Sequence, residues 1–191
     1  MTALMFSTVA CAARIPERLS AALLVCSVGP ADAPEATKKM VAINRWLLSL
    51  ARHYPRVAEC VGRICLRMIW RKGNQAIPKQ IELRLPPADR KALESGELRQ
   101  ALTDSSLEAL KNGVRGAATD GLLYGRHWGF DLRQIAMPVF LWHGEADIIV
   151  PAAMGHYLAA TIPNCQAQFY PDDGHFSLPY LHLREILHHA L

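Results

Sequence analysis

An aspartate and a histidine, each placed directly after a predicted strand, are the residues of this sequence best suited to chemistry. Asp147 follows the apolar run 137–142, and His175 follows the run 165–170. A helix predicted to begin at Pro151 joins the runs, so the strands would be parallel neighbours whose carboxyl ends share one edge of a sheet. There a carboxylate can accept the imidazole Nδ1 hydrogen, fix the tautomer and stabilise the imidazolium. We therefore predict that Asp147 and His175 form a catalytic pair.

The other polar residues near these loops have simpler interpretations. His143, at the end of the first run, is expected to pack or to make a backbone hydrogen bond. Asp172 and Asp173 are expected to form a turn. His182, His188 and His189 do not share a face at metal spacing, and no Cys-x-x-Cys pair is present, so no metal site is predicted.

Composition limits the classes of function. The chain has 191 residues, 51% of them hydrophobic, which suits one domain with a real core or one domain carrying an insertion. The net charge is only +4, with Lys and Arg scattered among acids, so nucleic-acid binding is not indicated. No apolar run reaches the roughly 18 residues of a membrane span, and no basic residue precedes Arg14 as a secretory leader would require.

The cysteines indicate a reducing compartment. There are five, an odd number, at irregular spacings and mostly within apolar runs. Free buried thiols in a cytoplasmic protein are the expected state of such residues. The five are Cys11, Cys26, Cys60, Cys65 and Cys165.

The pattern of apolar residues predicts the elements that position the pair. Residues 2–13 are small and apolar almost all round, which favours a buried helix, and the run 21–28, ended by Gly29 and Pro30, predicts a buried parallel strand. Helices are predicted over 38–51 and 56–70, the second with an apolar stripe expected to face the core. The run 165–170 alternates as an edge strand would, and 178–191 predicts a closing helix.

These elements predict an α/β fold of about three parallel strands that is interrupted by an all-helical insert. The core is assigned to residues 1–30 and 126–191, and the insert to 31–125. Because the insert joins the first strand to the second, it interrupts one domain and does not follow it.

Two loops of the sequence resemble those of the α/β-hydrolase family. Pro-Val-Phe-Leu-Trp-His-Gly-Glu-Ala-Asp147-Ile-Ile-Val-Pro resembles the family's acid loop, and Asp-Gly-His175-Phe-Ser resembles its histidine loop. Ala-Cys-Ala-Ala-Arg-Ile-Pro-Glu-Arg-Leu resembles the helix after the nucleophile elbow, running into the next strand. The resemblance implies the C-terminal part of a doubly wound sheet, with 31–125 as a helical cap that shapes the substrate pocket.

The sequence departs from the family at the nucleophile. No Gly-x-Ser-x-Gly is present, and the upstream strands and the loop that supplies an oxyanion-hole N–H are missing. Counting back from Cys11 as the family spacing requires reaches Thr2, a weak candidate whose hydroxyl is hindered and has no elbow. Ser7 and Cys11 are expected to pack within the helix. Without a nucleophile, His175 has no hydroxyl to activate.

The resemblance implies hydrolysis of a small, apolar ester, amide or related substrate without a cofactor. We expect this chain to be a truncated member that is inactive alone. An upstream start or a missing preceding segment would explain the truncation. The alternative is a non-catalytic ligand-binding or dimerising protein of the same descent, since the unpaired edge of strand 21–28 would favour a homodimer. A third interpretation is an enzyme completed by another chain that brings the elbow.

Overall fold

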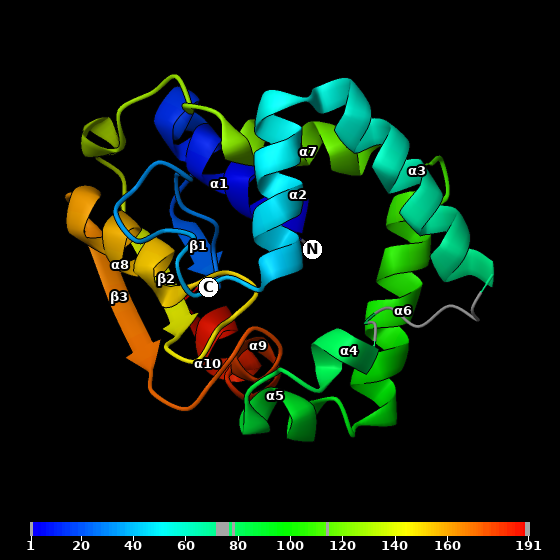
Figure 1. The fold of residues 1–191 in the computed structure, drawn as a ribbon. Coiled ribbons are helices and arrows are strands. Elements are labelled where there is room, and N and C mark those ends of the chain that lie inside the picture. The colour runs from blue at the N-terminus through cyan, green and yellow to red at the C-terminus, as the bar shows by residue number, and fades with distance from the viewer. Residues whose placement is uncertain (1, 72–76, 78, 114, 190–191) are drawn as a thin grey trace.

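A three-stranded parallel sheet forms the centre of the computed structural model, which describes residues 2–71, 77, 79–113 and 115–189. The strands are β1 (Ala22–Val25), β2 (Val139–Gly144) and β3 (Cys165–Tyr170), in the order β1-β2-β3 (Figure 1). The three strands predicted from sequence are confirmed. The first is shorter than the predicted 21–28, because Cys26 has a positive φ of 47° and takes the chain out of the strand.

The register of the strands brings their carboxyl ends together. Val25 lies beside Trp142, and Gly144 lies beside Tyr170. The loops that follow β2 and β3 therefore leave the sheet at the same edge. The central strand is nearly continuous in apolar residues because it is buried on both faces, whereas β3 is a half-exposed edge strand.

Helices cover both faces of the sheet. On one face α1 (Thr2–Arg14) and α8 (Ala152–Thr161) pack over Leu24, Val139 and Leu141. On the other, α9 (Ser177–Leu181) and α10 (Leu183–His188) cover Trp142. Two short 3-10 helices, η1 (Pro16–Arg18) and η2 (Leu132–Gln134), precede β1 and β2. The predicted closing helix is thus two short helices, which meet at His182.

In the part of helix α1 whose side chains are described, residues 7–14, burial is less complete than the composition predicts. Val9 and Ala12 are buried against the sheet, but Ser7 is exposed and Cys11 is only half-buried. A helix that covers one face of a sheet buries one stripe, so the small apolar residues on its other side remain accessible.

The described residues between β1 and β2 contain helices and no strand, as predicted. The helices are α2 (Ala42–His53), α3 (Pro55–Arg71), α4 (Lys79–Glu82), α5 (Pro87–Ala92), α6 (Gly96–Leu110) and α7 (Arg115–Gly125). Helix α2 packs against both α3 and α7 (Figure 1).

The prediction that the apolar stripe of α3 faces the core is wrong for the stripe side chains named next. Val57 and Ile64 are 49% and 57% exposed, and Cys60 is also exposed. The side of α3 that faces its neighbours carries small residues, since Ala58 is buried and Gly62 lines a cavity with α2 and α7. The stripe members Cys65, Met68 and Ile69 have side chains outside the described residues.

In the described part of the chain, no helix has both the length and the apolar character that crossing a bilayer requires.

Candidate active site

Asp147 is held in a tight loop after the central strand. Its Oδ1 accepts the backbone N–H groups of Ile149 and Val150, both at 2.8 Å, in the manner of an Asx turn. The side chain is buried, and its second oxygen remains available at the carboxyl edge of the sheet. The local sequence therefore both buries this carboxylate and fixes its direction.

His143 makes a hydrogen bond to the backbone of the same loop, which is one of the two roles expected from the sequence. Its Nε2 lies 2.9 Å from the carbonyl oxygen of Val150 and donates to it, so this nitrogen carries the proton. Burial lowers the pKa of His143, although the charge of Asp147 opposes this effect. Gly155 leaves the space that the ring occupies, because a Cβ there would lie 2.5 Å from the His143 Nδ1.

The histidine loop lies directly on the acid loop. The N–H of Ala146 donates to the carbonyl oxygen of Asp173 at 3.0 Å, and the N–H of Glu145 donates to that of Tyr170 at 2.9 Å. A Cβ on Gly144 would lie only 2.2 Å from the Asp173 oxygen. Glycine at 144 is therefore what permits the two loops to approach so closely.

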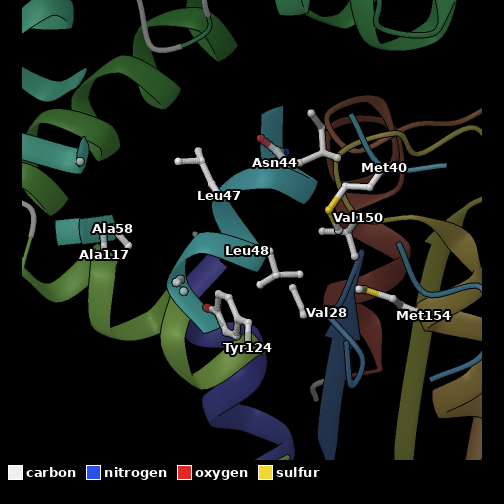
Figure 2. Close-up of a pocket in the computed structure, with 14 residues that line it drawn as sticks. Val28, Met40, Asn44, Leu47, Leu48, Ala58, Ala117, Tyr124, Val150 and Met154 are labelled. Atoms are coloured by element: carbon white, nitrogen blue, oxygen red, sulfur yellow. The ribbon is translucent and has the colours of Figure 1, made fainter. Parts of the chain in front are cut away.

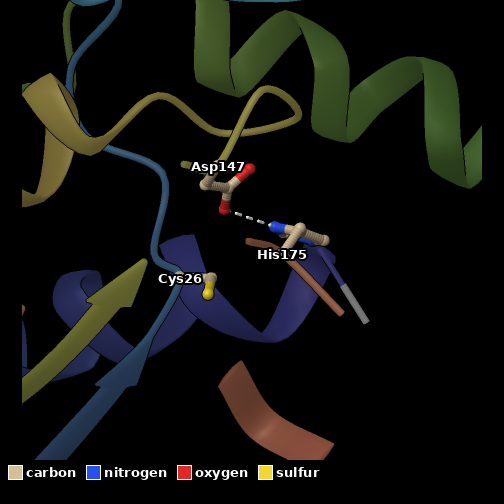
Figure 3. Close-up of side chains that lie close together, drawn as sticks. All are labelled: Cys26, Asp147 and His175. Atoms are coloured by element: carbon tan, nitrogen blue, oxygen red, sulfur yellow. Dashed lines mark hydrogen bonds and ion pairs between the residues drawn. The ribbon is translucent and has the colours of Figure 1, made fainter. Parts of the chain in front are cut away.

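This approach brings together the two side chains on which the sequence analysis rests. The Nδ1 of His175 lies 2.8 Å from Asp147 Oδ2, in a buried contact between residues 28 apart in the chain (Figure 3). Burial disfavours the charged ring, but the charge and hydrogen bond of Asp147 outweigh it and raise the pKa of His175. The arrangement stabilises an imidazolium and directs the Nδ1 proton toward the carboxylate.

A second buried carboxylate, which the sequence analysis did not identify, holds the histidine loop. Asp89 on α5 is fully buried. It accepts the N–H groups of His175 (3.0 Å), Phe176 (3.0 Å) and Ser177 (2.8 Å), and the hydroxyl of Ser177 (2.8 Å). In the sequence, Asp89 is an ordinary acid in a helical first turn after two prolines, and no local signal marks it as buried.

Cys26 lies beside the pair and was expected only to be a buried thiol. Its Sγ, an oxygen of Asp147 and a ring nitrogen of His175 all lie within 4.8 Å of one another (Figure 3). Sulfur, nitrogen and oxygen donors at this spacing are a set that zinc can bind. However, burial, followed by the charge of Asp147, raises the pKa of Cys26 well above its ordinary value. A nucleophile must be a thiolate, and this direction of the pKa shift disfavours the thiolate.

The sequence analysis also drew attention to Thr2, Asp172 and Asp173. Thr2 begins α1, and its side chain is outside the described residues. The carboxylate of Asp173 contacts Nε2 of His182 at 2.9 Å, and Asp172 is exposed. The carboxylates of Asp172 and Asp173 therefore do not join the Asp147–His175 pair.

An apolar cavity adjoins the acid loop. It has a volume of about 370 Å³ and lies between α2, α7 and the residues after Asp147 (Figure 2). Its walls are mostly aliphatic and include Val28, Leu48, Ala51, Tyr124, Val150 and Met154. Val150 also donates its N–H to Asp147, so one residue connects the cavity wall with the buried pair.

The geometry can be compared with that of known proteins. No protein-family model and no curated protein sequence matches the chain. Among solved structures, an enol-lactonase from Burkholderia xenovorans matches at a TM-score of 0.58 with 18% identity, covering 97% of this chain and 60% of the lactonase. A thermophilic esterase from Thermogutta terrifontis matches at 0.53 with 20% identity, covering 97% of this chain and 58% of the esterase. This chain has the α/β-hydrolase fold.

A further α/β-hydrolase fold protein, from Nakamurella multipartita, matches at a TM-score of 0.52 with 17% identity, covering 95% of this chain and 64% of that protein. The chain therefore spans about three fifths of the length of these α/β hydrolases. The fold that the acid and histidine loops indicated is confirmed, as a three-stranded parallel part of the sheet with flanking helices. Identities this low establish the fold and leave the activity to be argued from the site.

Proposed function

We propose that this α/β-hydrolase chain supplies the acid and histidine of a Ser-His-Asp type site that cleaves an ester or related bond. The observation that carries the proposal is the buried 2.8 Å contact between His175 Nδ1 and Asp147 Oδ2. With its Nδ1 proton directed to Asp147, the ring keeps a lone pair on Nε2, which is the form of a general base. The names of the compared lactonase and esterase agree with this class of reaction.

In this proposal His175 takes a proton from a nucleophilic hydroxyl through Nε2 and later returns it to the leaving group. Asp147 stays ionised and stabilises the imidazolium that forms between these steps. The raised pKa of His175 favours that intermediate state of the ring. The rigid Asx turn at Asp147 and the brace from His143 keep the carboxylate from turning away.

We also propose that the nucleophile comes from outside these 191 residues, so that the chain alone is a truncated and inactive form. The sequence contains no Gly-x-Ser-x-Gly. Cys26, the thiol beside the pair, has a raised pKa and contacts the Gly174 carbonyl oxygen at 3.8 Å. A neutral thiol held in that way is a poor nucleophile.

The substrate class follows from the cavity and the helices around it. We propose that residues 31–125 act as a cap over the sheet, and that the aliphatic walls accept a small apolar acyl or alcohol group. The walls have few polar groups, so burial of apolar area would provide most of the affinity. No cofactor enters this chemistry.

Hydrolysis of p-nitrophenyl acetate tests the proposal. The chain and its His175→Ala variant are expected to hydrolyse it at the same background rate, because no nucleophile is available for His175 to activate. A His175-dependent rate well above background, or covalent labelling of the chain by a fluorophosphonate, would contradict the proposed incompleteness. Loss of the raised His175 pKa in Asp147→Asn, measured by NMR titration, is expected if the pair forms in solution.

The second candidate is a non-catalytic ligand-binding or dimerising protein of this fold. Two observations favour it: the apolar cavity, and the free edge of β1, which pairs only with β2 in the described sheet. Unpaired strand edges favour association, so this candidate predicts a homodimer. Sedimentation at tens of micromolar would show a dimer, and a strictly monomeric profile would contradict dimerisation through this edge.

We place the protein in the cytoplasm. The described cysteines Cys11, Cys26, Cys60 and Cys165 are free thiols, as a reducing compartment maintains them. We propose no nucleic-acid or membrane partner. The mild net charge of +4 supports the first of these statements.

A further inference from the structure

Asp89 is a buried carboxylate whose hydrogen bonds all go to the loop that carries His175. It is fully buried, and a carboxylate in such a place is costly unless hydrogen bonds replace its water. Three consecutive N–H groups, at residues 175, 176 and 177, and the Ser177 hydroxyl supply them. The carboxylate and the histidine loop therefore satisfy each other across 86 residues of sequence.

These N–H groups would otherwise have no acceptor. They precede or begin α9, and the first N–H groups of a helix have no partner within it. Phe176, at the N-cap position, makes no side-chain capping bond. Asp89 thus caps α9 from another helix, α5, which lies against α9 in Figure 1. Since the cap includes the N–H of His175 itself, the carboxylate fixes the backbone from which the imidazole projects.

Glycine at 174 is shaped to this contact. A Cβ at that position would lie 2.3 Å from Asp89 Oδ2, closer than any real side chain approaches. The N–H of Gly174 in turn donates to Ser177 Oγ at 2.8 Å. Residues 174–177 are thus wrapped around one carboxylate, which leaves the His175 backbone little freedom to move.

We propose that Asp89 is a positioning residue for His175, through which the helical segment between β1 and β2 holds the imidazole against Asp147. The inference rests on the proposed catalytic role of that pair. The negative charge of Asp89 also acts on the ring, adding to the larger effect of Asp147 that raises the pKa of His175 against the effect of burial. Asp89 touches no reacting atom. It controls where the general base points and how basic it is.

NMR of imidazole-labelled protein tests the inference without any need for turnover. The Nδ1 proton of His175, bonded to a buried carboxylate, is expected far downfield in the wild-type chain and slow to exchange. Asp89→Asn keeps the shape of the side chain but replaces one oxygen by an NH2 group, which cannot accept a hydrogen bond. The His175 N–H donates to Oδ2 and the other three donors to Oδ1, so at least one of these bonds is lost together with the negative charge. We expect exchange of the Nδ1 proton to accelerate by about tenfold or more, as loss of one charge-assisted bond implies. The pKa of His175 is expected to fall.

Two further variants make the result specific. Ser177→Ala removes the hydroxyl that donates to Asp89 and accepts the Gly174 N–H, but it keeps the three backbone N–H bonds to Asp89. A smaller change in the same direction is therefore expected. Ser95→Ala removes a cap from α6, where Ser95 Oγ accepts the Leu98 N–H at 3.3 Å, a bond that does not involve the histidine loop. It is expected to lower stability without altering the His175 signal or pKa.

The outcomes separate the inference from the proposed function. A wild-type chain without the downfield signal would overturn the pair, and with it the proposed function. A normal wild-type signal that survives in Asp89→Asn with an unchanged pKa would overturn only the positioning role. If Asp89→Asn does not fold, two other measurements decide. The inference would be overturned if the exchange rate of the His175 Nδ1 proton is the same in Ser177→Ala as in the wild type, and if the backbone amides of residues 175–177 exchange freely in the wild type.

Discussion

Replacing Asp147 tests the central contact of this chain by two substitutions of different severity. Asp147→Ala removes the acceptor for the buried Val150 N–H and for the His175 Nδ1 proton, while the half-buried Ile149 N–H can turn to water. A buried donor left without a partner costs about 1–3 kcal/mol, so two of them cost about 2–6 kcal/mol of unfolding free energy. Asp147→Asn keeps an oxygen for both backbone N–H groups and changes only the contact with the ring. We expect it to cost about 1 kcal/mol at pH 8, within the range for one exchanged hydrogen bond.

The contact between Asp147 and His175 stabilises the fold to a degree that depends on pH. The pKa of His175 is raised in the folded chain, so its protonation adds stability that is fully present below the unfolded value of about 6.5. That contribution is lost as the pH rises through the folded pKa. Because Asp147→Asn removes the charge that raises this pKa, the stability gap between wild type and variant is expected to widen from pH 9 to pH 6. Each pKa unit that Asp147 adds is worth about 1.4 kcal/mol at the acidic end.

Urea unfolding at pH 6, 7.5 and 9, followed by tryptophan fluorescence, measures these gaps. The control is the same comparison made without the imidazole, between His175→Ala and the double variant His175→Ala/Asp147→Asn. The pH dependence of the stability gap should disappear there. A gap that stays constant from pH 6 to 9, or that grows toward pH 9, would refute the reasoning. An alanine variant no less stable than the asparagine variant would refute the role of Asp147 as the acceptor for its own loop.

Two other predictions concern the close approach of the loops and the thiol beside the pair. Gly144→Ala places a Cβ within 2.2 Å of the Asp173 carbonyl oxygen, so we expect a loss of about 1–3 kcal/mol from overpacking, measured by urea unfolding. Gly96→Ala, where nothing lies within 4 Å of the added Cβ, is the matched control and should lose nothing; equal losses would contradict this account. Cys26, with a raised pKa and almost no exposure, should react with iodoacetamide at least roughly 100-fold more slowly than exposed Cys60 at pH 7.5. Peptide mapping of the alkylated protein measures both rates, and comparable rates would show that Cys26 is accessible as a thiolate.

The hydrophobic pattern of a segment was sufficient to predict its structure where that structure depends on the segment alone. The runs 137–142 and 165–170 are strands because a buried central strand and a half-exposed edge strand leave different hydrophobic patterns in sequence. Their order along the chain, with a helix between them, implied parallel neighbours and so placed Asp147 and His175 at one edge. The loop lengths then left few other places for these two side chains.

Pattern failed where a neighbouring element decides which side of a helix is buried. The large apolar residues of α3 were expected inside, but Val57 and Ile64 are exposed, and Ala58 faces α2 and α7 instead. A helical stripe shows that one side differs from the other. It does not show which side another helix of suitable shape will cover, and small residues allow the closer approach.

The sequence by itself determined the parallel strands, the α/β fold and the meeting of an aspartate with a histidine, because each depends on periodicity and chain order that a single segment records. Only the tertiary structure decided that Asp89 caps the histidine loop, that Cys26 lies beside the pair, and that a cavity opens next to Val150. Those features depend on which distant elements pack together. Burial of a carboxylate or a thiol is a property of its three-dimensional surroundings, and the identity of the residue does not reveal it.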